Sequence, residues 1–470
     1  MRPTETILLP RLPPRTLVGL DLLSFTSTEQ FYGISDLPPG WHFLYTGTTE
    51  SFSLRCGSWL YVGDINSTYA QQQRNPTPTS GTVARYRALG NDEQIEVRIW
   101  KWNEDAESLA PLRSDSDSNR LEAMRWKANL GGLRQMGALF SYKKRERGGD
   151  GDEEDEDNDT VRSDWVKLTN RLSPEILSRI LGNPIIDDDD RPSWSINSGC
   201  SAAEDAEHIP GISAAAAAEE DKNVSRDGER MEEKELRFLP IDLKRTWREG
   251  AIGRERTEAA QDRSWALGNL IRRYSQDLDE KTGESQILGE LQFCFLMILT
   301  LMNYSCLSQW KRLLSLILTC STAIRERQSF FRDVLQLLRL QLRHCDDVDG
   351  GLFEMDGDYD ANFLRKLLTD FRQSLQQQRQ QQQEEAANDD VGSISAEMDA
   401  LEEWVRAEYG WELRKDSIMR RGMLQLEDGE EIEMEMSGAD EDDETGEYAP
   451  VIVDMGDTIE AAADFDMPMN

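Results

Sequence analysis

The chain has 470 residues, of which 38% are hydrophobic and 8% aromatic, so it can bury sizeable cores and is not a wholly disordered protein. Its formal net charge of −36 argues against strong non-specific nucleic-acid binding, because phosphate groups would be repelled. Residues 150–159 contribute −8, residues 187–190 contribute −4, and residues 427–470 carry 17 acids and no base, which assigns the acidity to loops and a tail.

Residues 6–103 favour short strands. The stretches "TLVGLDLLSF", "WHFLYTG" and "SWLYVGD" are aromatic or β-branched and are separated by Gly, Pro, Asn or Asp. In "QIEVRIWKW" apolar and polar residues alternate with period two, as in a half-solvated strand. In "RLSPEILSRILG", Ser173 can cap a helix that Gly182 ends. We predict a β-rich, sandwich-like N-terminal domain over residues 1–186, with an acidic loop at residues 148–160.

His42 lies in "LPPGWHFLYTG", directly after a Pro-Pro-Gly break. Histidine is readily recruited for catalysis or metal binding near neutral pH. In an extended segment the aromatic residues at 41, 43 and 45 point to one side, and His42 and Leu44 point to the other. The two other histidines do not give metal-ligand spacing with it. We interpret His42 as a structural or hydrogen-bonding residue rather than a catalyst.

Residues 187–234 contain an Asp tract, an alanine run and charged residues without an apolar period, which predicts a disordered acidic linker. Residues 235–376 favour leucine-rich helices joined by short connections, which predicts an all-α domain with antiparallel packing. Its most apolar run, residues 291–302, is well short of the roughly 20 residues that cross a bilayer. We expect a central buried helix there, and no membrane association.

Three further segments follow the helical domain. We predict a Gln-rich spacer at residues 377–393, a possible isolated amphipathic helix at residues 394–414 and an acidic disordered tail at residues 415–470. The tail contains a strand-like stretch, residues 448–455, whose apolar members are Tyr448, Val451, Ile452 and Val453. Such a patch can add as a strand to a partner's exposed sheet edge. A solubilised tail with a chance apolar cluster is an equal alternative.

Arginines recur along one predicted helix face, at Arg325, Arg332 and Arg339, with Arg343 four residues later. This stripe is either a solvated helix face or a surface for an acidic partner or RNA.

Asp356, Asp358 and Asp360 match the first half of a calcium loop. The required Gly and Glu are replaced by Ala361 and Leu367, so we interpret this stretch as an exposed loop with a helix cap.

Other chemical signatures are absent from the sequence. It has no phosphate-binding glycine loop, no Gly-x-Ser-x-Gly nucleophile turn and no Cys-x-x-Cys pair. Four of the six cysteines lie in leucine-rich stretches and are interpreted as reduced core residues of an intracellular protein. The proline-containing start "MRPTETILLPRLPP" does not match a secretory signal. We therefore predict no catalytic, cofactor-binding or metal site.

Two blocks of sequence resemble a known family. The stretch "GLDLLSFTSTEQFYGISDLPPGWHFLYTG" resembles the N-terminal signature of the A-one cistron splicing factor (Aar-two) family, in which a Gly-x-Asp segment leads to a His-Phe-Leu strand. The stretch "ILGELQFCFLMILTLMNYSCLSQWKRLLSLI" is similar to that family's helical core, and "DRSWALGNLI" to the helix before it. The signature positions taken as structural are Pro38, Pro39, Gly40, His42, Phe43 and Trp310.

The resemblance implies an α+β multidomain protein, with a β-rich N-terminal domain and an α-helical C-terminal domain similar to the VHS superhelix. It implies an assembly chaperone of the U-five small nuclear ribonucleoprotein in pre-mRNA splicing, present in cytoplasm and nucleus. Such a protein binds the RNase-H-like and Jab/MPN domains of Prp-eight and holds off the Brr-two helicase until it is released. The alternative is a general acidic adaptor or chaperone for basic nuclear proteins. A weaker third hypothesis is a metal-dependent hydrolase that uses the three aspartates.

Overall fold

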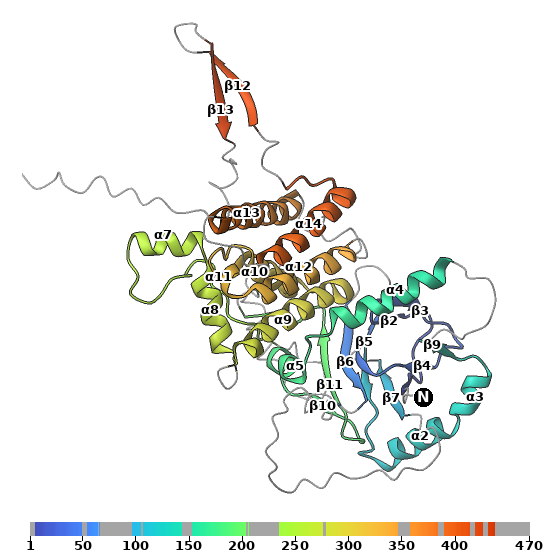
Figure 1. Cartoon of the computed structure of the whole chain (residues 1–470). Helices are drawn as coiled ribbons and strands as arrows, with labels where there is room; N and C mark the ends of the chain where they lie inside the picture. Colours follow the sequence, from blue (N-terminus) through green and yellow to red (C-terminus); the bar gives the residue numbers. More distant parts are fainter. Residues whose placement is uncertain are drawn as a thin grey trace, which may run out of the picture. The chain divides into compact units, whose positions relative to one another are not determined.

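The computed structural model describes part of the chain, which Figure 1 shows coloured along the sequence. The described residues are 5–48, 54–63, 65, 96–104, 107–142, 153–203, 205, 235–275, 279–345, 358–383, 390–413, 419–425 and 431–437. The chain divides into two compact units, residues 1–411 and residues 412–470, and each is described by itself.

The first sheet has five strands in the order β8-β7-β1-β4-β9. It is mixed, because β1 pairs parallel with β7 and β4 pairs parallel with β9, whereas the other pairs are antiparallel. Its strands are β1 (Glu5–Leu8), β4 (Gly33–Leu37), β7 (Glu96–Asn103), β8 (Ser108–Pro111) and β9 (Leu139–Ser141).

The second sheet has six strands in the order β10-β11-β6-β5-β2-β3, all antiparallel. Apolar side chains from both sheets form one core, with Ile7 and Ile34 from the first and Val18, Leu44 and Leu60 from the second. The predicted sandwich-like domain is therefore confirmed. The strands are β2 (Leu17–Leu20), β3 (Leu23–Thr26), β5 (Gly40–Gly47), β6 (Arg55–Val62), β10 (Ile185–Ile186) and β11 (Pro192–Asn197).

The strand β11 corrects the predicted linker boundary. Its residues pair with β6 from Ser193 opposite Leu60 to Asn197 opposite Cys56, and Trp194 and Ile196 are buried. The prediction of a disordered linker from residue 187 was wrong over these residues. The strand "PSWSIN" follows the Asp tract directly, and its alternation of Trp194 and Ile196 with polar residues is too short to stand out beside the tract. Residues 206–234 lie outside the described part of the chain.

In the described residues, four helices accompany the sheets: α2 (Asp117–Ala128), α3 (Leu130–Gln135), α4 (Glu153–Leu168) and α5 (Pro174–Leu181). The helix α5 begins and ends as predicted, since the Ser173 side chain accepts a hydrogen bond from the backbone N–H of Ile176 and Gly182 has φ +79°. The start of α4 corrects the predicted acidic loop, because residues 153–160 are helical. Carboxylates near a helix N-terminus interact favourably with its dipole.

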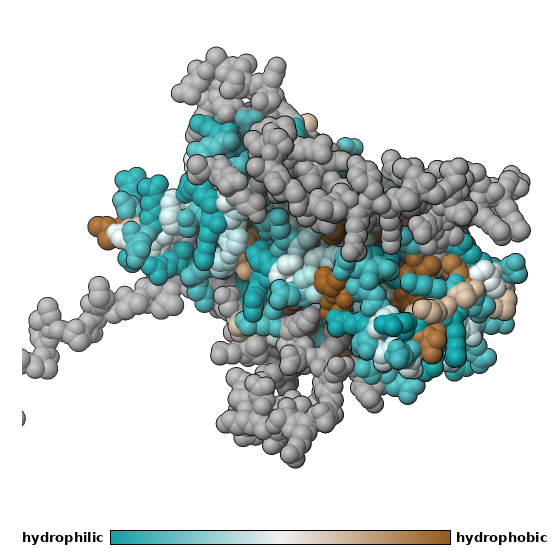
Figure 2. Space-filling model, turned by 90° about the horizontal axis from the view of Figure 1, so that it is seen from below, coloured by the Kyte–Doolittle hydropathy of each residue, from teal (hydrophilic) through white to brown (hydrophobic). Residues whose placement is uncertain are grey.

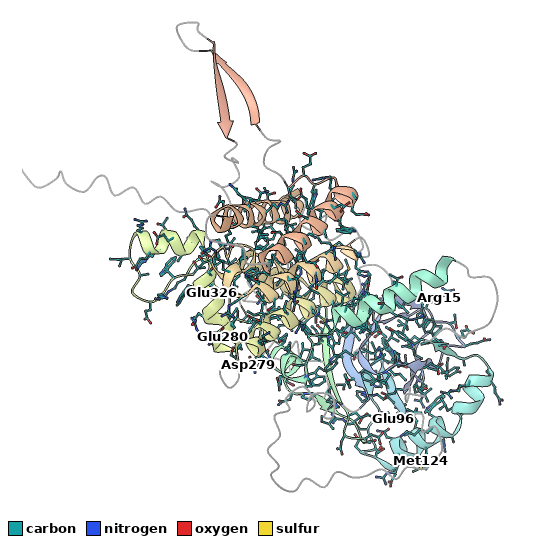
Figure 3. The ribbon with its side chains drawn as sticks, viewed as in Figure 1. Arg15, Glu96, Met124, Asp279, Glu280 and Glu326 are labelled. Carbon is teal, nitrogen blue, oxygen red and sulfur yellow. The ribbon has the colours of Figure 1, made fainter. Side chains whose placement is uncertain are left out.

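The helical domain is built around α9 (Glu280–Leu301), whose residues from Ile287 to Leu301 are all buried. The Asp279 side chain caps this helix and Glu280 is its first residue. Both residues are labelled in Figure 3. The helix is long and apolar enough to cross a membrane, but 83% of its most apolar window is buried inside the protein, which confirms the prediction of a core helix. The helices α8 (Ser264–Arg273), α10 (Tyr304–Ile317) and α12 (Gln328–Leu342) pack against it. The domain also contains α7 (Arg254–Gln261), α11 (Ala323–Glu326), α13 (Asp358–Gln383) and α14 (Asp390–Tyr409).

The helix α14 packs against α12 and α13, so the prediction of an isolated helix over residues 394–414 was wrong. Met398, Leu401 and Val405 are buried, and Arg372 of α13 pairs with Asp399 at 2.6 Å. The predicted Gln-rich spacer needs a similar correction, because α13 continues through Gln383. Glutamine is a good helix former, so a run of glutamines extends a helix that has already begun.

The second unit contains an antiparallel hairpin of β12 (Met419–Gln425) and β13 (Glu431–Ser437). The tail had been predicted to be disordered from residue 415, and this was wrong over the two strands. The stretch "EIEMEMS" alternates acidic and apolar residues with period two, which is a strand pattern. The strand-like stretch at residues 448–455 lies outside the described residues.

Candidate functional site

The Pro-Pro-Gly break and the Gly-x-Asp segment meet at His42. Its Nδ1 lies 2.8 Å from the Asp21 carboxylate and its Nε2 lies 2.8 Å from the carbonyl oxygen of Pro38. Tyr142 donates a 2.6 Å hydrogen bond to the same carboxylate oxygen, and the backbone N–H of Phe43 donates to the other at 2.9 Å. His42, Asp21 and Tyr142 form the buried cluster called here the His42 cluster.

Both ring nitrogens of His42 face acceptors, so the imidazole is satisfied only when both carry protons. Burial acts to lower the pKa of His42, but the Asp21 carboxylate and the hydrogen bonds raise it above its ordinary value. Burial and the Asp21 charge raise the pKa of the Tyr142 hydroxyl. His42 is only 1% exposed, so the cluster is closed to a substrate and joins β5 to its neighbours.

The opposite side of β5 carries the aromatic residues, as the alternation predicts. The ring of Phe43 lies 4.9 Å from that of Trp59, and Trp59 stacks on Trp165 of α4 at 5.7 Å. Trp59 also lies 6.3 Å from Phe293 of α9. The aromatic layer therefore connects the six-stranded sheet to the helical domain.

Glu290, in the stretch "LGELQF", is completely buried where the two domains meet. Its Oε2 accepts a 2.5 Å hydrogen bond from Arg179 of α5. Its two oxygens also lie 3.0 and 3.1 Å from the backbone N–H nitrogen of Leu239, and Gln309 donates to Oε1 at 2.8 Å. One carboxylate thus joins the N-terminal domain, the segment before α7 and two core helices.

The neighbours of Glu290 complete this joint. Gln292 accepts a hydrogen bond from the backbone of Arg171 at 2.9 Å and donates to the carbonyl of Lys167 at 3.0 Å. A Cβ on Gly289 would lie 2.3 Å from Ile176 of α5, so only glycine permits this close approach. We call Gly289, Glu290 and Gln292 the interdomain joint.

Two further polar residues hold core elements in place. Asn303 donates to the carbonyl of Cys200 at 2.7 Å and accepts from the backbone N–H of Cys306, which attaches the segment after β11 to α10. The indole of Trp310 donates to Gln341 at 3.0 Å, which places this signature residue in the helical core. Sequence reasoning assigned no contact to Glu290, Gln292 or Asn303. The available signal was a polar side chain inside an apolar run, which must find a partner when buried.

The predicted arginine stripe is divided in the structure. Arg325 belongs to the separate helix α11, whereas Arg332 and Arg339 lie on α12 and Arg343 caps its end. Predicting one continuous stripe was therefore wrong, because Arg327 has non-helical backbone angles and separates α11 from α12. Arg339 and Arg343 line a cleft, and Arg332 is not among its lining residues.

The other candidate residues do not form a site in the described residues. Asp358 and Asp360 begin the helix α13, and Asp356 lies outside the described part. No group of three potential metal ligands occurs among the residues that the structure describes. All six cysteines are buried and free, and burial raises the pKa of Cys56 to about 11, which disfavours a reactive thiolate. Tyr448, Val451, Ile452 and Val453 lie outside the described part.

Comparison with known proteins matches both domains. The family models described as the AAR2 N-terminal domain and the AAR2 C-terminal repeat region match residues 3–182 and 238–414, which together are more than half of the chain. Relatives called protein AAR2 homolog are 23% identical over 350 residues in Homo sapiens and 22% over 348 residues in Mus musculus. In each case the alignment covers 72% of this chain and 75% of the relative. The chain therefore belongs to the AAR2 family, which is the Aar-two family that the sequence resembles.

Proposed function

We propose that this splicing-related protein is an assembly chaperone of the U-five small nuclear ribonucleoprotein. It binds the RNase-H-like and Jab/MPN domains of Prp-eight and keeps the Brr-two helicase from docking until it is released. It acts as a binding protein rather than an enzyme, in cytoplasm and nucleus. The observation that carries the proposal is the interdomain joint. Its residues Gly289, Glu290 and Gln292 lie in the helical-core block that resembles the family.

The joint supports a scaffold that presents surfaces of both domains together. Glu290 and Gln292 are nearly or fully buried and each contacts the N-terminal domain through defined hydrogen bonds. A fixed relative placement lowers the entropy cost of engaging two partner domains at once. Large exposed apolar side chains lie mostly on the N-terminal domain, and Figure 2 shows brown patches toward that side of the molecule. In the described residues they are Leu54, Leu121, Met124, Met136, Val166 and Ile186, with Ile252 and Tyr304 in the helical domain.

Deleting residues 419–470 removes both strands of the hairpin together with the 17 acids of residues 427–470, and it distinguishes this proposal from a general acidic chaperone. We expect the truncated chain still to bind a Prp-eight fragment containing both domains, with affinity reduced by about tenfold to a hundredfold. Contacts made by the folded domains remain, whereas contacts made by the tail are lost. Isothermal titration calorimetry measures the two affinities.

Polylysine serves as the comparison ligand for this deletion. A general acidic chaperone would lose most of its binding to polylysine and to the Prp-eight fragment alike. Complete loss of binding to the fragment, together with unchanged folding, would overturn the proposed role of the folded domains. A competition assay with the Brr-two helicase on the same fragment then tests whether the two proteins exclude one another.

The tail prediction concerns strand addition at Val451, Ile452 and Val453. Replacing Ile452 by proline removes a backbone donor and fixes the backbone, which should weaken binding to the Prp-eight fragment by about 1–3 kcal/mol. The matched replacement Asp454→Asn keeps the donor and should change the affinity much less. Calorimetry on both variants decides, since equal affinities for the parent and Ile452→Pro would reject strand addition.

A further inference from the structure

We propose that a cationic cleft between the two domains binds an acidic peptide segment of a partner protein. The cleft has a volume of about 410 Å³ and is lined by the end of α4 and the turn after it, by α9 and by α12. Among the described residues, its charged lining is formed by Lys167, Arg171, Arg339 and Arg343 and by one carboxylate, Asp333. The cationic cleft is therefore formed only when both domains are in place.

The basic side chains retain capacity for a further anion. Arg171 lies 2.7 Å from Asp333 and its side chain is 40% exposed. Lys167 lies 3.3 Å from Asp164, and Arg339 lies 3.6 Å from Glu397. Arg343 has no ion pair with the described residues, and its guanidinium is the group that we expect a carboxylate to reach first.

The rim of the cleft is held by the interdomain joint. Gln292 bonds the backbone of both Lys167 and Arg171, so the two residues are fixed relative to α9. Gln292 also donates to Asn170 at 2.8 Å, and all three of these N-terminal residues line the cleft. A site whose backbone is already ordered loses less entropy when a ligand binds.

The lining favours a peptide over a nucleic acid. Guanidinium groups match the planar geometry of a carboxylate and bind it through two parallel hydrogen bonds. Leu288, Leu337 and Leu340 supply an apolar floor for an aliphatic side chain. Base recognition usually requires an aromatic stacking platform, and none of the described residues that line the cleft is aromatic.

The test uses the full chain and a rhodamine-labelled peptide in which one leucine is flanked by pairs of glutamates. Fluorescence polarisation should show binding at about 50 mM salt that weakens strongly at about 200 mM, because screening reduces the attraction. Arg343→Glu should weaken binding by at least about tenfold, since it replaces attraction by repulsion. Arg343→Gln should weaken it less. Arg332→Glu is the matched control, because it changes the net charge equally on the same helix at a residue that does not line the cleft. Arg332 lies 4.0 Å from the lining residue Asp333, whose closer partner is Arg171 at 2.7 Å.

Each outcome decides the proposal, and thermal melts establish that the variants remain folded. Weakening by Arg343→Glu with near-parental binding by Arg332→Glu supports the cleft. Equal weakening by both variants, no binding by the parent, or equal binding of a peptide with glutamine in place of glutamate overturns it. Stronger binding of a single-stranded oligonucleotide that competes with the peptide also overturns it. The probe is synthetic, so the result is independent of whether Prp-eight is the partner.

Discussion

Replacing His42 by alanine is expected to lower the free energy of unfolding by about 3–5 kcal/mol, the usual cost of removing one partner of a buried ion pair. The Asp21 carboxylate would keep its bonds from Tyr142 and Phe43 but would lose the opposite charge beside it. Because Asp21 is 1% exposed, water cannot replace the imidazolium without rearrangement of the sandwich. Scanning calorimetry of parent and variant measures the difference.

The same substitution should alter the pH dependence of stability. The pKa of folded His42 is raised, so its contribution is fully present below the unfolded value of about 6.5 and is lost as the pH rises through the folded value. The parent is therefore expected to lose stability above about pH 6.5 through this group, and His42→Ala should lack that decline. The stability difference between the two proteins should shrink accordingly.

The double variant Asp21→Asn, His42→Ala serves as the control for this mechanism. It removes the uncompensated charge, so its destabilisation should be smaller than the sum of the two single effects. An unchanged melting temperature for His42→Ala, or parallel pH profiles for parent and variant, would show that the His42 cluster does not stabilise the fold in this way.

Replacing Glu290 by alanine should have an effect of similar size, about 3–5 kcal/mol, because it leaves buried groups of three elements without their acceptor. Arg179 would lose its carboxylate, and the backbone N–H of Leu239 would lose the acceptor that Glu290 provides. The contact between α5 and α9 should loosen. We expect the N-terminal and helical domains to unfold in separate calorimetric transitions in the variant and together in the parent.

Two substitutions on α9 bracket this prediction. Glu290→Gln keeps an oxygen acceptor and should lie between the parent and alanine. Glu280→Ala removes a 45% exposed carboxylate that pairs with Arg327, and Arg327 keeps its 2.8 Å pair with Glu284, so the loss should be about 1 kcal/mol or less. Similar losses for Glu280→Ala and Glu290→Ala would contradict the role assigned to the joint.

The sequence predicts those elements whose pattern is local. The alternation around His42 indicates which residues share a face of β5, and Ser173 and Gly182 mark the ends of α5. The run of apolar residues after Gly289 indicates the central position of α9. In each case the physical signal, a period or a cap, is contained within a few neighbouring residues.

The sequence does not predict contacts that depend on distant partners. The bond between Arg179 and Glu290 joins residues 111 positions apart, and nothing local in either segment specifies the other. The cationic cleft likewise requires Arg171 and Arg343 to meet across the domain boundary. The position of α14 was missed for the same reason, because its apolar face matches α12 and α13 only after those helices have folded.

The pairing of β11 with β6 has a consequence for the order in which the protein is made. The strand β6 leaves the ribosome long before β11, and the family match to the N-terminal domain already ends at residue 182. Until residues 192–197 emerge, the backbone groups along one side of β6 are an open template for another nascent chain. A fragment that stops at Gly182 would leave this side of β6 unpaired permanently and should self-associate. The smallest N-terminal fragment that we expect to stay monomeric therefore extends past Asn197.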